Sequence, residues 1–236
     1  FRSSRVRDSA GLRQVRVMDS LEHRKAQGGA RVAYPLEAAN AETETGEGTV
    51  GSLGHTKIVT NPVTDKLRSG QPALGSWLGL CSPVVAESLA HMGWDWLVVD
   101  VEHSPVGFET MVNMFRAIQL GGAVPMARMP WNNTVWCQRT LDAGALGLVV
   151  PMVNTAEDAK KVVSNMKYAT KGQRSWGGSR VASYIEGDYR TWTEDNLAIM
   201  VMIETVEAVE NAEAIVAYQR ALDINEKIFC SLNNSG

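Results

Sequence analysis

The chain has 236 residues, of which 44% are hydrophobic, 21% charged and 7% aromatic, a composition typical of one large or two small globular domains. Its formal net charge of −3 comes from 23 basic and 26 acidic side chains, and this near balance favours a small-molecule partner over nucleic acid or an anionic membrane. The three cysteines are far apart, which argues against a disulfide framework or a zinc site, and no apolar run approaches the roughly 20 residues that cross a bilayer.

The first segment, residues 1–60, is rich in Arg, Ser, Gly, Ala and Glu and poor in large aliphatic side chains, so we expect a disordered arm. Its first 16 residues carry five arginines and one acidic residue. This composition is typical of a mitochondrial transit peptide as well as of a plain basic arm. A cytoplasmic location is the first expectation, and a mitochondrial one is the alternative.

From residue 61 onward, short apolar runs alternate with segments of helical period. The runs are almost continuously apolar, as strands buried on both faces must be. Apolar stripes predict helices near residues 108–118 and 159–166. Thr155 and Asp158 have the spacing of a capping box, and Thr205 precedes another apolar stripe, so helices are expected to begin soon after strands. The expected strands cover residues 74–80, 95–100, 123–129, 146–151 and 198–204.

This alternation predicts an α/β fold with a parallel sheet. A doubly wound sheet and a TIM (β/α)8-type barrel both fit, and the absence of Gly-x-Gly-x-x-Gly after the first strand favours the barrel. Five clear strands and a doubtful sixth near Lys227 cannot close eight strands, so the barrel is expected to be truncated after about the fifth or sixth strand. Residues 61–223 would form this partial barrel.

Polar side chains follow three of the expected strands. Asp100, Glu102 and His103 follow the second strand, Arg128 ends the third, and Glu204 ends the fifth. In a barrel, the carboxyl ends of all strands gather around one mouth, where such residues are typically catalytic. These five residues are therefore the candidate site.

Each of these residue types suits a particular chemistry. His103 is the candidate base, because an adjacent carboxylate fixes the tautomer of an imidazole and raises its basicity; a loop or helix-capping cluster is the alternative. Arg128 at the end of an apolar strand predicts an anionic substrate, with a structural ion pair as the alternative. Glu204 suits a hard divalent cation, which prefers oxygen ligands.

A series of motifs in chain order also carries a resemblance. They include Asp-Val-Glu-His-Ser-Pro at residues 100–105 and Ile-Glu-Thr at residues 203–205. The others lie at residues 68–72, 75–80, 90–99, 141–145, 150–153 and 167–174. Over residues 61–223 the chain resembles the HpcH/HpaI aldolase family. The resemblance implies a metal-dependent class II aldolase of the phosphoenolpyruvate/pyruvate barrel superfamily, which reversibly cleaves a 4-hydroxy-2-oxo acid to pyruvate and an aldehyde.

The resemblance also implies roles for individual residues. Glu204 would bind Mg²⁺ or Mn²⁺, Arg128 would stabilise the enolate, and His103 with Asp100 would transfer the proton through water. A cation and a guanidinium directed at a developing oxyanion are what carbon–carbon cleavage beside a carbonyl requires. A homo-oligomer, either a trimer or a hexamer, is implied as well. The further substrate-binding candidates are Trp77, Glu102 and Gly177.

The chain departs from the family pattern at two points. Met202 stands where the family usually has Gln, and after Asp223 the Gly-Pro-x-Asp-Leu turn that supplies a second metal ligand is missing. Residues 224–236 are therefore expected to be a tail unlike the family, and the chain to be incomplete. Two alternatives follow: a catalytically inactive or incomplete barrel homologue, or a macrophomate-synthase-like enzyme that obtains its metal enolate by decarboxylation.

Overall fold

A computed structural model describes residues 57–177 and 179–221 of the chain. The expected arm before residue 57, the doubtful sixth strand near Lys227 and the tail from residue 224 lie outside the described residues, and so does the segment on which mitochondrial targeting was based. Residues 57–60 already contact the domain, because Ile58 forms a parallel bridge with Ile185 and the Val59 carbonyl accepts a hydrogen bond from Trp192 Nε1 at 2.9 Å. In the described part, no helix is long and apolar enough to span a membrane.

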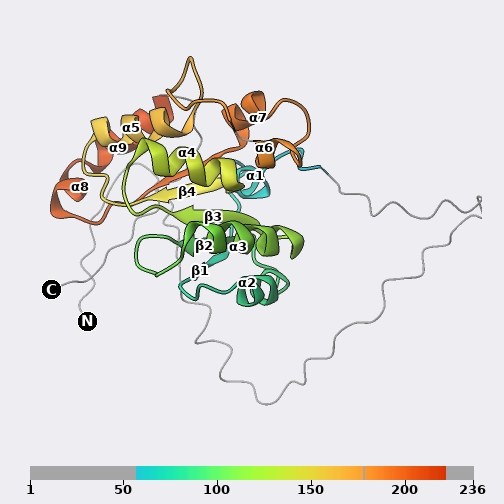
Figure 1. Ribbon diagram of the computed structural model, residues 1–236. Coiled ribbons are helices and arrows are strands. Elements are labelled where there is room, and N and C mark those ends of the chain that lie inside the picture. Colours follow the sequence, from blue (N-terminus) through green and yellow to red (C-terminus); the bar gives the residue numbers. More distant parts are fainter. Residues whose placement is uncertain (1–56, 178, 222–236) are drawn as a thin grey trace, which may run out of the picture. The chain divides into compact units, whose positions relative to one another are not determined.

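Five parallel strands alternate with helices along the chain (Figure 1). The strands are β1 (Gly75–Leu78), β2 (Trp96–Asp100), β3 (Val124–Arg128), β4 (Gly147–Val150) and β5 (Ala198–Val201). The helices are α1 (Pro62–Arg68), α2 (Pro83–Ala90), α3 (Phe108–Leu120), α4 (Thr134–Ala143), α5 (Ala156–Met166), α6 (Ser179–Ala182), α7 (Tyr189–Asn196), α8 (Val206–Glu210) and α9 (Ala212–Ala221).

The strands lie side by side in sequence order, β1-β2-β3-β4-β5, and every neighbouring pair is parallel. The predicted α/β fold is therefore confirmed, with each strand one to three residues shorter at one or both ends than its predicted range. Within the described residues the sheet is open rather than closed into a barrel.

Helices begin soon after strands because a capping side chain stands there. Asn133 caps α4 by accepting the N–H of Trp136 at 3.1 Å. Thr155 forms the predicted capping box with Asp158 at the start of α5, and Thr205 caps α8. The resulting loops are short, so the side chains that end the strands stay close to the edge of the sheet.

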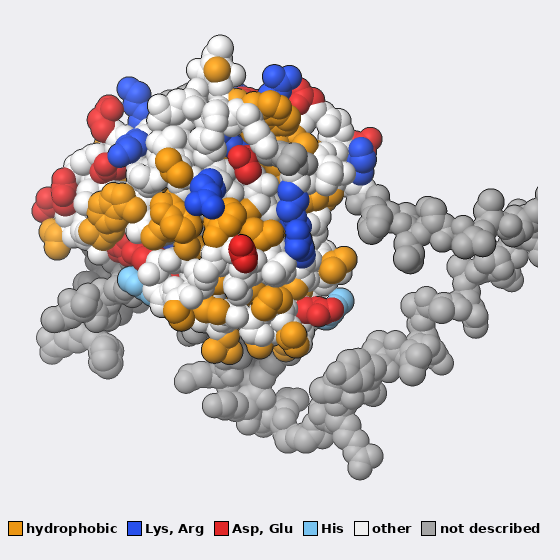
Figure 2. All heavy atoms as spheres, in the orientation of Figure 1, with side chains coloured by type: hydrophobic (Ala, Val, Ile, Leu, Met, Phe, Trp, Pro, Cys, Tyr) orange, Lys and Arg blue, Asp and Glu red, His pale blue; other side chains and the backbone are white. Residues whose placement is uncertain are grey.

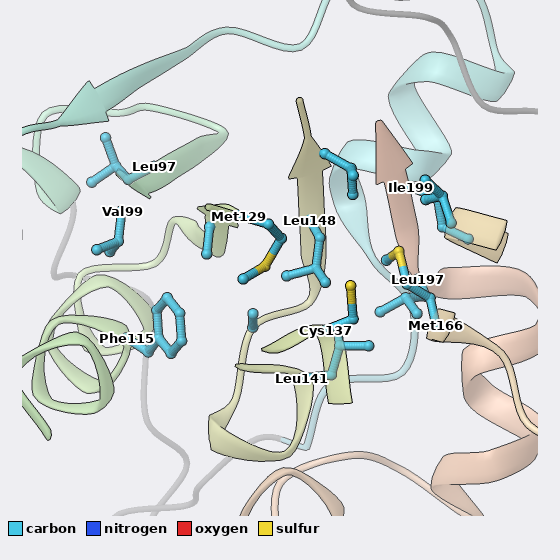
Figure 3. Close-up of a cluster of buried hydrophobic side chains, with 14 of the residues drawn as sticks. Leu97, Val99, Phe115, Met129, Cys137, Leu141, Leu148, Met166, Leu197 and Ile199 are labelled. Carbon is cyan, nitrogen blue, oxygen red and sulfur yellow. The ribbon is translucent and has the colours of Figure 1, made fainter. Parts of the chain in front are cut away.

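The two faces of the sheet pack against different helices, because successive strand residues point to opposite faces. One face packs against α2 to α5, α8 and α9. Figure 3 shows Phe115 of α3 and Cys137 and Leu141 of α4 near strand side chains of this face. The buried hydrophobic strand residues of this face are Leu78, Leu97, Val99, Ala127, Leu148, Val150, Ile199 and Val201.

The opposite face carries the alternate strand residues, including Val98, Met126 and Met200, and packs against α1, α6 and α7. Tyr189 and Trp192 of α7 are both buried in this second cluster. In Figure 1, α6 and α7 lie together near α1. Asp100, Arg128 and Glu204 each lie an even number of positions after a strand residue of this second set, so their side chains are on the same side of the sheet. The candidate site therefore belongs to this face.

The outer surface of the helices is mixed in character. Figure 2 shows hydrophobic side chains between charged ones on the face where α3 and α4 lie in front. Leu120 of α3 and Val135 of α4 are among the exposed ones. Singly scattered apolar side chains are normal on protein surfaces, so this face identifies no partner.

Candidate active site

Asp100 and Arg128 lie opposite one another at the carboxyl ends of β2 and β3. Arg128 Nε donates a hydrogen bond to Asp100 Oδ1 at 2.9 Å, and Arg128 Nη2 donates to Oδ2. The side chains are only 14% and 11% exposed. A bidentate pair of this kind is strong and directional, so it fixes both the plane and the direction of the guanidinium.

Asp100 also organises the turn that follows β2. Its Oδ1 accepts the backbone N–H groups of Glu102 and His103, both at 3.1 Å, and its carbonyl accepts the hydroxyl of Ser104. Burial raises the pKa of Asp100, but the hydrogen bond and charge of Arg128 and the two backbone N–H groups together hold it below its ordinary value. Asp100 is therefore an ionised acceptor that shapes the site.

Glu102 lies between the guanidinium and the imidazole. Its Oε2 is 3.4 Å from Arg128 Nη1 and 3.8 Å from His103 Nε2. The pKa of Glu102 lies above its ordinary value, mainly because burial disfavours the charged carboxylate. The negative charges of Glu204 and Asp100 raise this pKa further, while the positive charges of Arg128 and His103 lower it. The acid whose side chain meets the imidazole is thus Glu102, while Asp100 contacts His103 through the backbone.

Glu204 follows β5 and completes the group. Its Oε1 accepts the N–H of Met152 at 2.8 Å. Glu204 forms no ion pair with any described residue. It is close enough to Glu102 for its negative charge to raise the pKa of that side chain. The structure therefore brings the five predicted residues to one edge of the sheet.

Of the further candidates, Trp77 joins this group and Gly177 does not. The Cζ atom of Arg128 lies 4.8 Å from the centroid of the Trp77 ring, within the range of a cation–π interaction. A Cβ atom placed on Gly177 would meet only Asp142 Oδ2, at 3.9 Å. Asp142 lies in the last turn of α4, and because the helix of a β/α unit runs back antiparallel to its strand, that turn lies toward the amino ends of the strands.

Sequence reasoning missed Met152. Its φ of 56° places it in the left-handed region, where Gly or Asn is the expected residue. A methionine carries no sequence signal for that conformation. The one indirect signal is its place directly after an apolar strand, where functional groups of such folds gather.

The charges of the group fit a divalent cation. When ionised, the carboxylates of Asp100, Glu102 and Glu204 outnumber the single guanidinium of Arg128. Magnesium is commonly bound by one or two carboxylates, with water and substrate oxygens completing its shell. Within residues 57–177 and 179–221 no group of three or more His, Cys, Asp or Glu side chains could hold a metal ion. A cation at this edge of the sheet would therefore have to take most of its oxygen ligands from water and substrate rather than from protein side chains.

Acid is expected to destabilise the protein through Asp100. Its pKa in the folded protein lies below the ordinary 3.8, so the folded state binds this proton less readily than the unfolded state. The stabilisation is complete above about pH 5 and is lost as the pH falls through the ordinary value and then the lowered one. Urea unfolding between about pH 6 and pH 2 should show a shallower pH dependence for Asp100→Asn than for the parent chain. An equal change with the exposed Asp195→Asn would contradict this assignment.

Comparisons with known proteins agree with this geometry. A family model described as HpcH/HpaI aldolase/citrate lyase matches residues 73–225. The chain is 38% identical over 161 residues to a 4-hydroxy-2-oxo-heptane-1,7-dioate aldolase of Klebsiella pneumoniae, covering 67% of this chain and 61% of that protein. It is 37% identical over 157 residues to a hydroxypyruvate/pyruvate aldolase of Rhizorhabdus wittichii, covering 66% and 62%. The chain thus spans about three fifths of the length of these relatives.

Solved structures lead to the same family. A HpcH/HpaI aldolase/citrate lyase family protein of Burkholderia cenocepacia matches with a TM-score of 0.65 and 31% identity, over 72% of this chain and 68% of that one. Macrophomate synthase matches with a TM-score of 0.60 and 26% identity, over 70% and 60%. These neighbours are TIM-barrel proteins, so the open five-stranded sheet corresponds to part of such a barrel. The chain belongs to the HpcH/HpaI aldolase/citrate lyase family.

Proposed function

We propose that the protein is a lyase that reversibly cleaves a 4-hydroxy-2-oxo acid to pyruvate and an aldehyde, with Mg²⁺ or Mn²⁺ as cofactor. The observation that carries this proposal is the buried bidentate pair of Arg128 and Asp100, with Glu102 and Glu204 at the same edge of the sheet. The two aldolases that the chain resembles support the reaction type. A small 2-oxo acid is the proposed partner, and a homo-oligomeric assembly belongs to the same proposal.

Arg128 is suited to bind an anionic substrate. A guanidinium carries five N–H donors, and the contacts to Asp100 and Glu102 leave donors on both terminal nitrogens for a substrate oxygen. Because Asp100 and the Trp77 ring already fix its orientation, the group does not have to reorganise as negative charge develops on the keto oxygen. A divalent cation, when bound, supplies Lewis-acid polarisation of the carbonyl.

His103 and Glu102 are suited to move the proton. Cleavage of the bond between C3 and C4 requires that the C4 hydroxyl lose its proton as the aldehyde leaves, and that C3 of the resulting enolate gain one. His103 Nε2 lies 3.8 Å from Glu102 Oε2, and the raised pKa of Glu102 brings it closer to a value at which it can exchange a proton. Asp100, with its lowered pKa, holds the turn that carries both groups.

The test is pyruvate release from 4-hydroxy-2-oxoheptanedioate by the purified chain, with and without Mn²⁺. We expect Glu204→Gln to remove the metal-dependent turnover, because an amide is a weaker ligand and carries no charge. Glu207→Gln is the matched control, since Glu207 is an exposed acid of α8. Absence of turnover in the soluble parent chain would contradict the proposal and favour an inactive homologue.

A second candidate is decarboxylation of a 2-oxo diacid to the same enolate. The similarity to macrophomate synthase, with a TM-score of 0.60, favours considering it. Assaying oxaloacetate beside the hydroxy acid separates the two. Turnover of oxaloacetate alone would favour this second candidate, since aldol cleavage requires the C4 hydroxyl.

A further inference from the structure

The loop between β4 and α5 contains a backbone conformation that its sequence does not favour. Among the residues that the structure describes, Met152 is the only non-glycine residue with a positive φ, 56°. A residue with a Cβ atom is strained in this region, so the conformation persists only where surrounding contacts impose it. Such contacts are present on the side of the loop that faces β5.

Hydrogen bonds join this loop to the one that follows β5. The N–H of Met152 donates to Glu204 Oε1 at 2.8 Å. Two residues further along, Asn154 Oδ1 accepts the hydroxyl of Thr205 at 2.6 Å, and the Asn154 carbonyl accepts Asn211 Nδ2 at 3.0 Å. Both loops are thus fixed to one another next to the Glu204 carboxylate.

The Met152 side chain does not explain the strain. It is 37% exposed and belongs to neither of the two hydrophobic clusters, so no core contact of the side chain accounts for the left-handed backbone. A negative φ would turn the Met152 N–H relative to Asn154. Either the bond from this N–H to Glu204 would then break, or the bonds of Asn154 to Thr205 and Asn211 would. The feature that the loop preserves is therefore the direction of one backbone N–H.

We propose that the peptide N–H of Met152 is a positioning group for Glu204. By holding Oε1, it fixes the rotation of the carboxylate, and Oε2 would be the oxygen available to a divalent cation. This inference rests on the proposed function, because it requires that Glu204 bind a cation. Groups that orient a metal ligand through a hydrogen bond typically change metal affinity by about 10- to 100-fold when they are removed.

Backbone and side-chain roles are separated by two substitutions in the full chain. Met152→Gly removes the side chain but adopts a positive φ freely, whereas Met152→Val keeps a side chain and disfavours this φ strongly because it is β-branched. The probe is Mn²⁺ itself, titrated with the signal of free Mn²⁺ in electron paramagnetic resonance, with the melting temperature measured in parallel. We expect Met152→Gly to bind Mn²⁺ as the parent does and to melt no lower, and Met152→Val to bind about tenfold more weakly.

The remaining outcomes overturn the inference in distinguishable ways. Parental Mn²⁺ affinity in Met152→Val, or a loss in Met152→Gly as large as in Met152→Val, would show that the backbone conformation does not position Glu204. A folded parent that binds no Mn²⁺ would overturn the proposed function and this inference together. Should Met152→Val not fold, Met152→Ala keeps the Cβ atom and the backbone preference of the parent and is expected to bind Mn²⁺ as the parent does; a tenfold loss in Met152→Ala would show that the side chain, and not the backbone N–H, positions Glu204.

Discussion

Arg128→Met is expected to lower the free energy of unfolding by about 3–5 kcal/mol, the usual cost of removing one partner of a buried ion pair. The Arg128 side chain is 14% exposed and that of Asp100 is 11% exposed, so the carboxylate left behind would be neither solvated nor neutralised. The lost contacts also include the one to Glu102 at 3.4 Å and the stacking on Trp77. Urea unfolding at neutral pH measures the change.

Turnover should fall in the same variant by about 10²- to 10³-fold, the range found when a donor to a developing oxyanion is removed. Arg116→Met is the matched control, because the Arg116 guanidinium meets Asn113 on the exposed surface of α3. We expect that control to stay within about 0.5 kcal/mol of the parent. Equal stabilities of the two variants would show that the pair with Asp100 contributes nothing to the fold.

Phe115→Ala is expected to cost about 3–5 kcal/mol, through lost burial and the cavity left behind. Phe115 is fully buried in α3, at the contact between this helix and the sheet (Figure 3). Close-packed surroundings relax only in part around such a deletion, so the space is not refilled. The midpoint of urea unfolding should shift to lower denaturant with little change in its slope.

The same helix provides the control for this variant. Leu120, at the end of α3, is 75% exposed, so Leu120→Ala removes an apolar side chain without creating a cavity. Its effect should stay within about 0.5 kcal/mol. Because Ala has at least the helix propensity of Leu, a loss comparable to that of Phe115→Ala would mean that the cost of the Phe115 variant does not come from a cavity between α3 and the sheet.

The strands could be predicted from sequence because both of their faces are buried, but their ends could not. Residues 198–203 form one apolar run, yet β5 ends at Val201. Met202, which is 3% exposed, keeps only a single bridge to β4, through its N–H to the Val150 carbonyl at 2.9 Å, and Ile203, also 3% exposed, lies beyond the strand. Hydrophobicity reports burial and not hydrogen bonding between strands, so an apolar run overestimates the length of a strand.

The residues of the site could be predicted better than their contacts. Asp100, Arg128 and Glu204 were identified because polar groups that end apolar strands share one edge of a parallel sheet. Which acid faces His103 depends instead on the turn after β2, where Asp100 is engaged by Arg128 and backbone N–H groups. Such a turn is determined by hydrogen-bond geometry, which residue spacing does not encode.

The alternation of side chains along each strand determines which part of the molecule a substitution disturbs. Val99 packs against the helices, while its neighbours Val98 and Asp100 belong to the opposite face. Val98 and Met126 are fully buried in the cluster that packs against α1, α6 and α7, so substitutions there would disturb the packing beneath Asp100 and Arg128 and leave the packing against α2 to α5 intact. Because neighbouring positions of one strand serve different clusters, a single substitution is expected to act on one face of the sheet and to spare the other.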